Sequence, residues 1–76
     1  MLILYTKNNC QYCQKVKQAF LENNISYEER NIENEDCLEE VKGYGAHTMP
    51  FLLDTTANVK LNDSADIIDY VQEYSF

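Results

Sequence analysis

Two cysteines three positions apart, Cys10 and Cys13, lie where a buried strand is followed by an amphipathic helix. The run Leu2–Tyr5 before them is continuously apolar, which predicts a strand buried on both faces inside a sheet. Residues 6–9 are polar and typical of a turn. From Cys10 to about Asn23, apolar residues recur at helical spacing, namely Cys13, Val16, Ala19 and Phe20. The pattern therefore predicts a cysteine pair at the start of a helix that follows a central strand.

The rest of the chain predicts two further helices. Asn34 is a good N-cap for the first, since Glu35 and Asp36 in its first turn suit the helix dipole. Gly43 or Gly45 ends this helix, and its expected apolar face is Cys37, Leu38, Val41 and Tyr44. Asp63 or Ser64 caps the last helix. Its expected buried face is Ile67, Ile68, Val71 and Tyr74.

Three further segments read as strands. Residues 25–32 predict a more exposed second strand, while 51–53 and 59–61 predict a hairpin around a polar stretch at 54–58. The resulting order is β-α-β-α-β-β-α, and the first β-α-β is expected to form a right-handed parallel unit. We expect an α/β fold with a four-stranded mixed sheet flanked by three helices. With 76 residues, the chain has room for one core, so we expect a single domain over residues 1–76.

Charge excludes several classes of partner. The chain carries 13 acidic residues against six Lys or Arg, for a net charge of −7. Phosphate binding requires the opposite sign, so we expect no nucleic acid and no anionic membrane surface as partner. No apolar run is long enough for a membrane span, and we expect a cytoplasmic monomer. The first 21 residues contain three lysines and no acid, which makes a local basic segment around the cysteines.

The position of Cys10 favours redox chemistry. Backbone N–H groups at a helix start carry partial positive charge and stabilise a thiolate over a thiol, and Lys7 adds a full positive charge nearby. Cysteines in such places have pKa values lowered to roughly 3.5–7.5. Because the thiolate is the nucleophile of disulfide exchange, Cys10 is the expected attacking residue. Cys13, one turn further and on the apolar stripe, is expected to be more buried and to resolve a mixed disulfide.

The alternative for a Cys-x-x-Cys pair is half of a metal site. Cys37 and His47 would complete a Cys3His set by count. However, Cys37 is explained by the apolar face of its helix, and no second close pair of ligands exists. We therefore expect no bound metal.

Two segments carry a resemblance to a known family. The stretch from Tyr5 to Cys13, which ends in Cys-Gln-Tyr-Cys, resembles the opening of glutaredoxins, whose usual site is Cys-Pro-Tyr-Cys. Thr48, Met49 and Pro50 resemble the Thr-Val-Pro signature of the same family. The order of elements also resembles the minimal thioredoxin-like fold of glutaredoxins over essentially the whole chain.

The resemblance implies a site for glutathione as co-substrate, with no tightly bound cofactor. Pro50 would be cis and face the cysteine pair, and Thr48 and Met49 would offer backbone hydrogen bonds to the bound thiol. Lys7 would pair with the glycine carboxylate of glutathione, and Tyr12 would line the cleft. Ser64 and Asp66 match the positions that hold the γ-glutamyl end.

The leading hypothesis is a glutathione-linked thiol–disulfide oxidoreductase that reduces protein disulfides and glutathione mixed disulfides through Cys10 and Cys13. A second is a glutaredoxin-like electron donor to ribonucleotide reductase, recharged by thioredoxin reductase. Asn62 and Asp63 favour the donor, because they stand where the family often has Gly-Gly and crowd the place expected for the carboxylate of glutathione. A third is a metal-binding module, with zinc or a glutathione-bridged iron–sulfur cluster.

Overall fold

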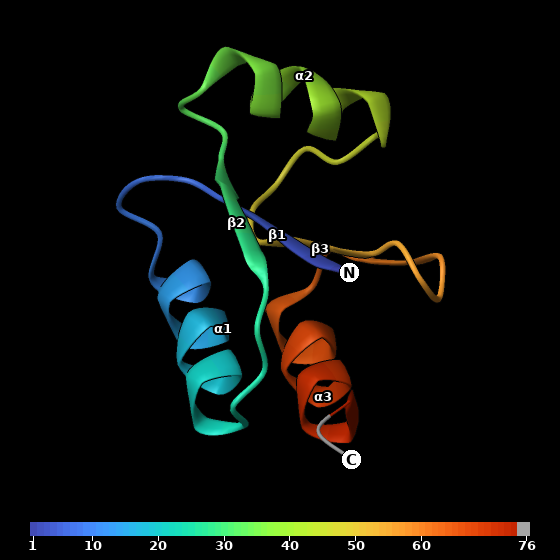
Figure 1. Ribbon diagram of the computed structural model, residues 1–76. Coiled ribbons are helices and arrows are strands. Elements are labelled where there is room, and N and C mark those ends of the chain that lie inside the picture. The colour runs from blue at the N-terminus through green and yellow to red at the C-terminus, as the bar shows by residue number, and fades with distance from the viewer. Residues whose placement is uncertain (75–76) are drawn as a thin grey trace.

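One four-stranded sheet lies between helices on its two faces (Figure 1). The structure is a computed structural model and describes residues 1–74. Its elements are β1 (Leu2–Thr6), α1 (Gln11–Glu22), β2 (Glu28–Asn31), α2 (Glu35–Gly43), β3 (Phe51–Asp54), β4 (Val59–Leu61) and α3 (Ser64–Tyr74). Within residues 1–74, no helix has both the length and the apolar composition needed to span a bilayer.

The sheet is mixed, with the strand order β2-β1-β3-β4. β1 runs parallel to β2 and antiparallel to β3, and β4 closes an antiparallel hairpin with β3. This confirms the expected α/β fold, with its order of elements and its four-stranded sheet. β1 and β3 are central strands buried along their whole length, as the continuous apolar run at 2–5 predicts.

Each face of β1 supplies one of two apolar clusters. Leu2 and Leu4 point towards α1 and α3, where they join Val16, Ala19, Phe20, Leu52, Ile67 and Val71. Ile3 and Tyr5 point to the other face, where they join Cys10, Cys13, Val41, Ala46, Met49, Phe51 and Leu53. Because side chains alternate across a strand, a single apolar run fills both clusters. The cysteine pair belongs to the cluster on the side of α2.

Asparagines in the left-handed region turn the chain at three places. Asn9, Asn24 and Asn58 each have φ of 55°. Asn tolerates this conformation better than most residues other than glycine. Asn9 directs the chain from β1 into α1, which places Cys10 at the N-terminus of this helix. Asn24 follows the end of α1, in agreement with the predicted stop.

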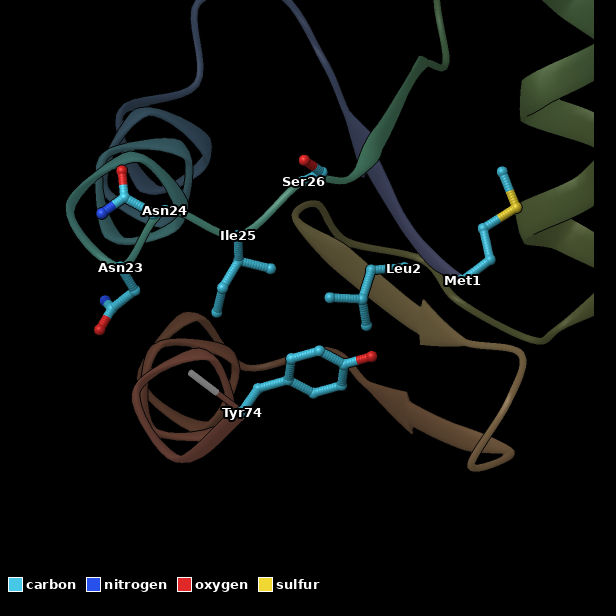
Figure 2. A pocket seen from close by; sticks show the side chains of 7 residues that line it. All are labelled: Met1, Leu2, Asn23, Asn24, Ile25, Ser26 and Tyr74. Carbon is cyan, nitrogen blue, oxygen red and sulfur yellow. The ribbon is translucent and has the colours of Figure 1, made fainter. Parts of the chain in front are cut away.

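Three details differ from the sequence expectations. β2 covers Glu28–Asn31 only, because Ile25 and Tyr27 pack as a connection against the cluster under α1 instead of pairing with β1. Tyr44 is 44% exposed, since it lies at the C-cap of α2 beyond the buried face. Tyr74 is 43% exposed, because the last turn of α3 borders an open pocket together with residues 23–26, Met1 and Leu2 (Figure 2).

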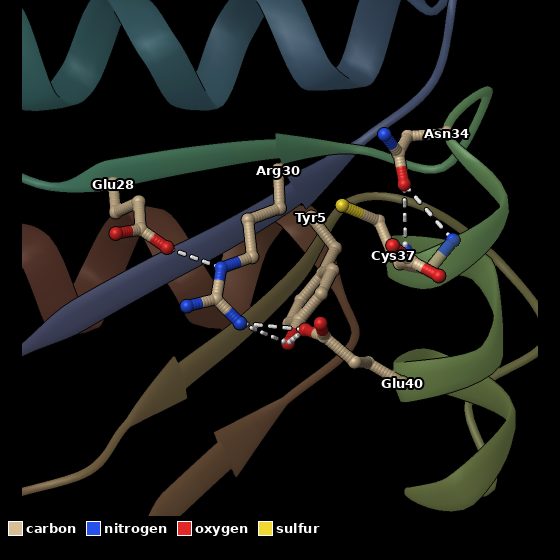
Figure 3. Close-up of polar contacts among 7 residues, drawn as sticks. Tyr5, Glu28, Arg30, Asn34, Cys37 and Glu40 are labelled. Carbon is tan, nitrogen blue, oxygen red and sulfur yellow. Dashed lines mark hydrogen bonds and ion pairs between the residues drawn. The ribbon is translucent and has the colours of Figure 1, made fainter.

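A polar network joins α2 to the sheet (Figure 3). The hydroxyl of Tyr5 donates to Glu40 Oε1 at 2.6 Å, and Arg30 Nη1 donates to the same oxygen at 2.6 Å. Arg30 also pairs with Glu28. Burial and the Glu40 hydrogen bond raise the pKa of Tyr5 to about 12. Hydrogen bonds from Tyr5 and Arg30 lower the pKa of Glu40, so these contacts favour its charged form.

Candidate active site

Cys10 is the N-cap of α1, as the sequence predicts. Its backbone is extended, and its Sγ accepts the N–H of Cys13 at 3.1 Å. The first turns of a helix leave such N–H groups without backbone partners. The sulfur of Cys10 therefore accepts a hydrogen bond from one of these N–H groups, and the same hydrogen bond stabilises a thiolate.

Cys10 and Cys13 form a disulfide, with their Cα atoms 5.2 Å apart. Cys13 is 1% exposed and Cys10 is 6% exposed, so Cys13 is the more buried of the two, as expected. Cys37 is free and half-buried against the edge of the same apolar cluster. The pair can thus hold two electrons as thiols or release them by forming the disulfide.

The segment Thr48–Pro50 lies next to the disulfide. The Met49–Pro50 peptide bond is cis, as the family resemblance implies. Met49 is buried with the two cysteines, and its carbonyl oxygen lies 3.9 Å from Cys10 Sγ. Within residues 1–74, no hydrogen bond to the N–H of Met49 is present. The backbone of Met49 is therefore free to pair with an extended chain bound beside Cys10.

An open groove of about 500 Å³ begins at this segment. It is lined by Lys7, Tyr12, Thr48, Met49, Pro50, Asn62, Asp63 and Ser64. Six of the residues that the resemblance assigns to glutathione thus border one groove, although they come from three separate parts of the chain. The seventh, Asp66, is not among the groove residues, although it lies in the first turn of α3, two residues after Ser64.

The groove is lined by side chains of both charge signs. Lys7 is exposed and forms no ion pair within the described part of the chain. Tyr12 is 51% exposed, and the ammonium of Lys15 lies 5.5 Å from the centre of its ring. Asp63, by contrast, caps α3, since its Oδ1 accepts the N–H of Ala65 at 2.8 Å. A carboxylate of the chain itself thus occupies the N-terminus of α3.

Asn62 and Asp63 are the groove residues that are absent from the predicted glutathione set. Asn62 Nδ2 donates to the carbonyl oxygens of Thr48, at 2.8 Å, and Pro50, at 3.0 Å. The departure from Gly-Gly was the signal in the sequence that pointed to these two positions. What their side chains contact was not visible there, because the partners of Asn62 are 12 and 14 residues away.

The metal alternative finds no support in the geometry. Among residues 1–74, no three side chains of His, Cys, Asp or Glu lie close enough together to hold a metal ion. His47 is exposed, and Cys37, although it packs against the same apolar cluster as Cys10 and Cys13, forms no such group with them. The structure therefore does not bring Cys10, Cys13, Cys37 and His47 together as a ligand set.

Comparisons with known proteins agree with this site. The sequence matches the protein family described as glutathione S-transferase, N-terminal domain, over residues 4–75. A putative glutaredoxin of Mycobacterium tuberculosis is 34% identical over 68 residues, which cover 86% of this chain and 81% of the relative. The glutaredoxin-like protein NrdH of Lactococcus lactis is 34% identical over 53 residues, covering 68% of this chain and 74% of the relative.

A solved structure shows the same fold. The glutaredoxin-like NrdH-redoxin of Escherichia coli, a protein with a thioredoxin-like activity profile, superposes with a TM-score of 0.79. It is 20% identical, and the match covers 91% of each chain. The glutaredoxin relatives and the cysteine pair at the start of α1 place the present protein among the thiol–disulfide oxidoreductases, and its fold is the thioredoxin fold. Within that class, its sequence relatives show that the chain belongs to the glutaredoxin family.

Proposed function

We propose that this oxidoreductase reduces disulfides of partner proteins and is recharged by a dithiol reductase of the thioredoxin reductase class rather than by glutathione. The observation that carries the choice of reductant is the Asp63 carboxylate at the N-terminus of α3. Ribonucleotide reductase is the acceptor that we expect from the donor-type resemblance. The similarity to the glutaredoxin-like protein NrdH of Lactococcus lactis supports the proposal of a donor of this type.

The reaction uses the two cysteines in turn. The Cys10 thiolate attacks one sulfur of the substrate disulfide, forms a mixed disulfide and releases the other sulfur as a thiolate. Cys13 then gives up its proton and attacks Cys10 Sγ, which releases the second substrate thiol and leaves the Cys10–Cys13 disulfide. The protein has given the substrate two electrons and the proton of Cys13, and the thiolate released first takes its proton from water. The reductase returns the two electrons, and the Cys13 thiol takes up a proton again, which completes the cycle.

Asp63 is unfavourable for glutathione for two reasons. The γ-glutamyl end of glutathione carries a carboxylate that the family resemblance places at the start of the last helix. There the N–H of Ala65 already donates to Asp63. A second carboxylate would also lie beside the first, and like charges at short range repel. A protein substrate that uses only the backbone of Met49 meets neither obstacle.

Glutathione remains the second candidate because of the shared groove. Lys7 and Tyr12 border it together with Thr48–Pro50 and Ser64, which is the arrangement that the resemblance implies for a glutathione site. If glutathione is the reductant, Lys7 supplies the charge for its glycine carboxylate. This candidate requires the γ-glutamyl end to bind without the Ala65 N–H.

A coupled NADPH assay distinguishes the two reductants. The oxidised protein is supplied once with thioredoxin reductase and once with glutathione plus glutathione reductase, with a protein disulfide as acceptor in both. We expect turnover in the first arm and little in the second. Equal or faster turnover with glutathione would overturn the proposed reductant. Failure to reduce any protein disulfide, even after reduction by dithiothreitol, would overturn the proposed activity itself.

The role of Asp63 is tested by Asp63→Ser. Serine still caps a helix but carries no charge, so α3 should stay intact. We expect the glutathione-dependent rate to rise and the rate with thioredoxin reductase to stay unchanged. Asp69→Asn is the matched control, because it removes the same charge from an exposed position further along α3. An equal rise in both variants would show a general charge effect instead.

A further inference from the structure

Among residues 1–74, Asn62 is the one residue outside the cysteine pair whose side chain donates hydrogen bonds to the backbone of the segment at 48–50 beside Cys10. Its amide nitrogen lies 2.8 Å from the carbonyl oxygen of Thr48 and 3.0 Å from that of Pro50. An amide NH₂ has two N–H bonds, so one donor serves each carbonyl. Asn62 therefore binds the segment on both sides of Met49.

The position of Asn62 in the sheet explains why a side chain is needed there. The ladder between β3 and β4 ends at the pair Leu52 and Leu61, since α3 begins at Ser64 and the backbone turns away. Residues 48–50 thus extend beyond the reach of the β4 backbone. The Asn62 amide takes over at this point and supplies the donors that a longer β4 would have offered.

The two hydrogen bonds fix the orientation of Met49. The carbonyls of Thr48 and Pro50 are held towards Asn62, while that of Met49 lies 3.9 Å from Cys10 Sγ. Rotating the Met49 peptide group away from Cys10 would require breaking the bonds to its neighbours.

We propose that Asn62 is a positioning residue, which holds Thr48–Pro50 so that a disulfide bound along Met49 presents its sulfur to Cys10. This inference rests on the proposed reduction of protein disulfides. Asn62 acts through the segment around Met49, and within residues 1–74 it forms no hydrogen bond with either cysteine. It should therefore affect how well a peptide disulfide docks and leave the reactivity of the Cys10 thiolate unchanged.

The test compares Asn62→Asp and Asn62→Ala with the wild type. Asp keeps the shape but places an oxygen opposite two carbonyl oxygens, whereas Ala removes both donors without adding charge. Asn58→Asp is the matched control, because it makes the same change on the exposed β3–β4 turn, at a residue without a side-chain hydrogen bond within residues 1–74. Thermal unfolding of each variant establishes that it is folded at the assay temperature.

Each pre-reduced protein is mixed with a disulfide-bonded peptide and, separately, with a small aromatic disulfide that is too short to pair along residues 48–50. For Asn62→Ala we expect the half-saturating peptide concentration to rise about 5- to 30-fold, as expected for two lost hydrogen bonds. For Asn62→Asp, the half-saturating peptide concentration should rise by at least the same factor. The maximal rate and the rate with the small disulfide should stay within about twofold of the wild type, and the pH midpoint of Cys10 alkylation should be unchanged. Asn62→Gln, which keeps the amide, should recover part of the peptide affinity.

Two results would overturn the inference. One is an unchanged half-saturating peptide concentration in Asn62→Ala. The other is an equal loss with the peptide and with the small disulfide, since that would show a general structural role. Both differ from failure of the proposed function, in which the wild type itself would not reduce the peptide.

Discussion

The two cysteines of the site have different surroundings, and these predict different roles. Cys10 takes a helix N–H and borders Met49 at the groove, whereas Cys13 lies deeper, at 1% exposed. An incoming disulfide therefore meets Cys10 first. Cys13 is placed to react only with the Cys10 sulfur, which lies within bonding reach.

Single serine variants of the cysteines should separate these roles. Cys10→Ser should reduce protein disulfides no faster than background, because the nucleophile is lost. Cys13→Ser should still attack once but remain trapped as a mixed disulfide, because nothing resolves it. Mass spectrometry of the intact protein after mixing with a peptide disulfide checks this. A trapped adduct on Cys10→Ser, through Cys13, would reverse the assignment.

Asp54 shows how a buried charge is accommodated in this sheet. It is 1% exposed, and its carboxylate accepts hydrogen bonds from the hydroxyl of Tyr70 and the N–H groups of Thr56 and Ala57. Burial by itself would raise the pKa of Asp54, but these donors outweigh it and the pKa is lowered. The folded state therefore favours the charged carboxylate.

Replacing this carboxylate should cost stability in a pH-dependent way. Asp54→Asn should lower the free energy of unfolding at pH 7 by about 2–3 kcal/mol, the usual size for hydrogen bonds to a buried charge. Because the folded pKa is lowered, the wild-type advantage is fully present above the unfolded value of about 4 and is lost as the pH falls through the folded value. Urea unfolding at pH 7 and below pH 4 measures the difference. A gap between the two proteins that stays constant with pH would contradict this account.

At the scale of elements, α2 depends on a few specific contacts. Asn34 caps it by accepting the N–H groups of Asp36 and Cys37 (Figure 3). Val41 is the one fully buried side chain of α2. The hydrogen bonds of Glu40 to Tyr5 and Arg30 supply the polar part of its attachment to the sheet. The chain leaves α2 through Gly45, at φ of 77°, and runs on to the segment beside Cys10.

Tyr5→Phe should loosen α2 and leave the apolar packing of the ring intact. The variant loses the hydrogen bond to Glu40, so we expect a loss of about 1–2 kcal/mol at pH 7 and faster amide exchange in α2. The raised pKa of Tyr5, about 12, means that its contribution is fully present below pH 10 and is lost as the pH rises towards 12. The stability gap to the wild type should therefore close at alkaline pH.

Tyr74→Phe serves as the control, because that hydroxyl lies on the exposed last turn of α3. It should leave the stability at pH 7 and the exchange of α2 unchanged. If it destabilised the protein as much as Tyr5→Phe, the effect could not be assigned to the link with Glu40.

For the whole molecule, the net charge of −7 opposes compactness, because 13 acidic residues share a surface with six basic ones. The ion pairs Lys17–Glu29, Arg30–Glu28, Arg30–Glu40 and Lys42–Glu39 are at least partly exposed and contribute little each. Salt screens both effects, with a Debye length of about 10 Å at 0.1 M. We expect repulsion to dominate the balance.

Added salt should therefore stabilise the protein. Raising NaCl from about 0.01 M to 0.5 M at pH 7 should shift the urea midpoint upwards, because the Debye length falls from about 30 Å to well under 10 Å. Urea is uncharged, so the salt concentration can be varied independently. A lower midpoint at high salt would show that the ion pairs outweigh the repulsion between the acidic residues.

The sequence by itself determined the order of elements, the α/β class and the place of the cysteine pair. These features depend on residues close together in the chain: the apolar run at 2–5, the helical spacing after Cys10 and the caps at Asn34 and Asp63. Periodicity and capping are local, so they can be read without knowing what packs against each element. The same reasoning was wrong about Tyr44 and Tyr74, because helical spacing does not show where the covering layer ends.

Only the tertiary structure decided what surrounds the reactive sulfur. Asn62 reaches Thr48 and Pro50 across 14 and 12 residues of chain, and Asp63 meets the groove because β4 ends beside the segment at 48–50. The exclusion of Asp66 from that groove likewise depends on which side of the first turn of α3 faces it. Such contacts arise when strands pair, and a hydrogen bond between distant residues leaves no periodic trace in a single sequence. The redox chemistry of the cysteine pair could therefore be predicted from local sequence, whereas the residues that surround the pair depend on the fold.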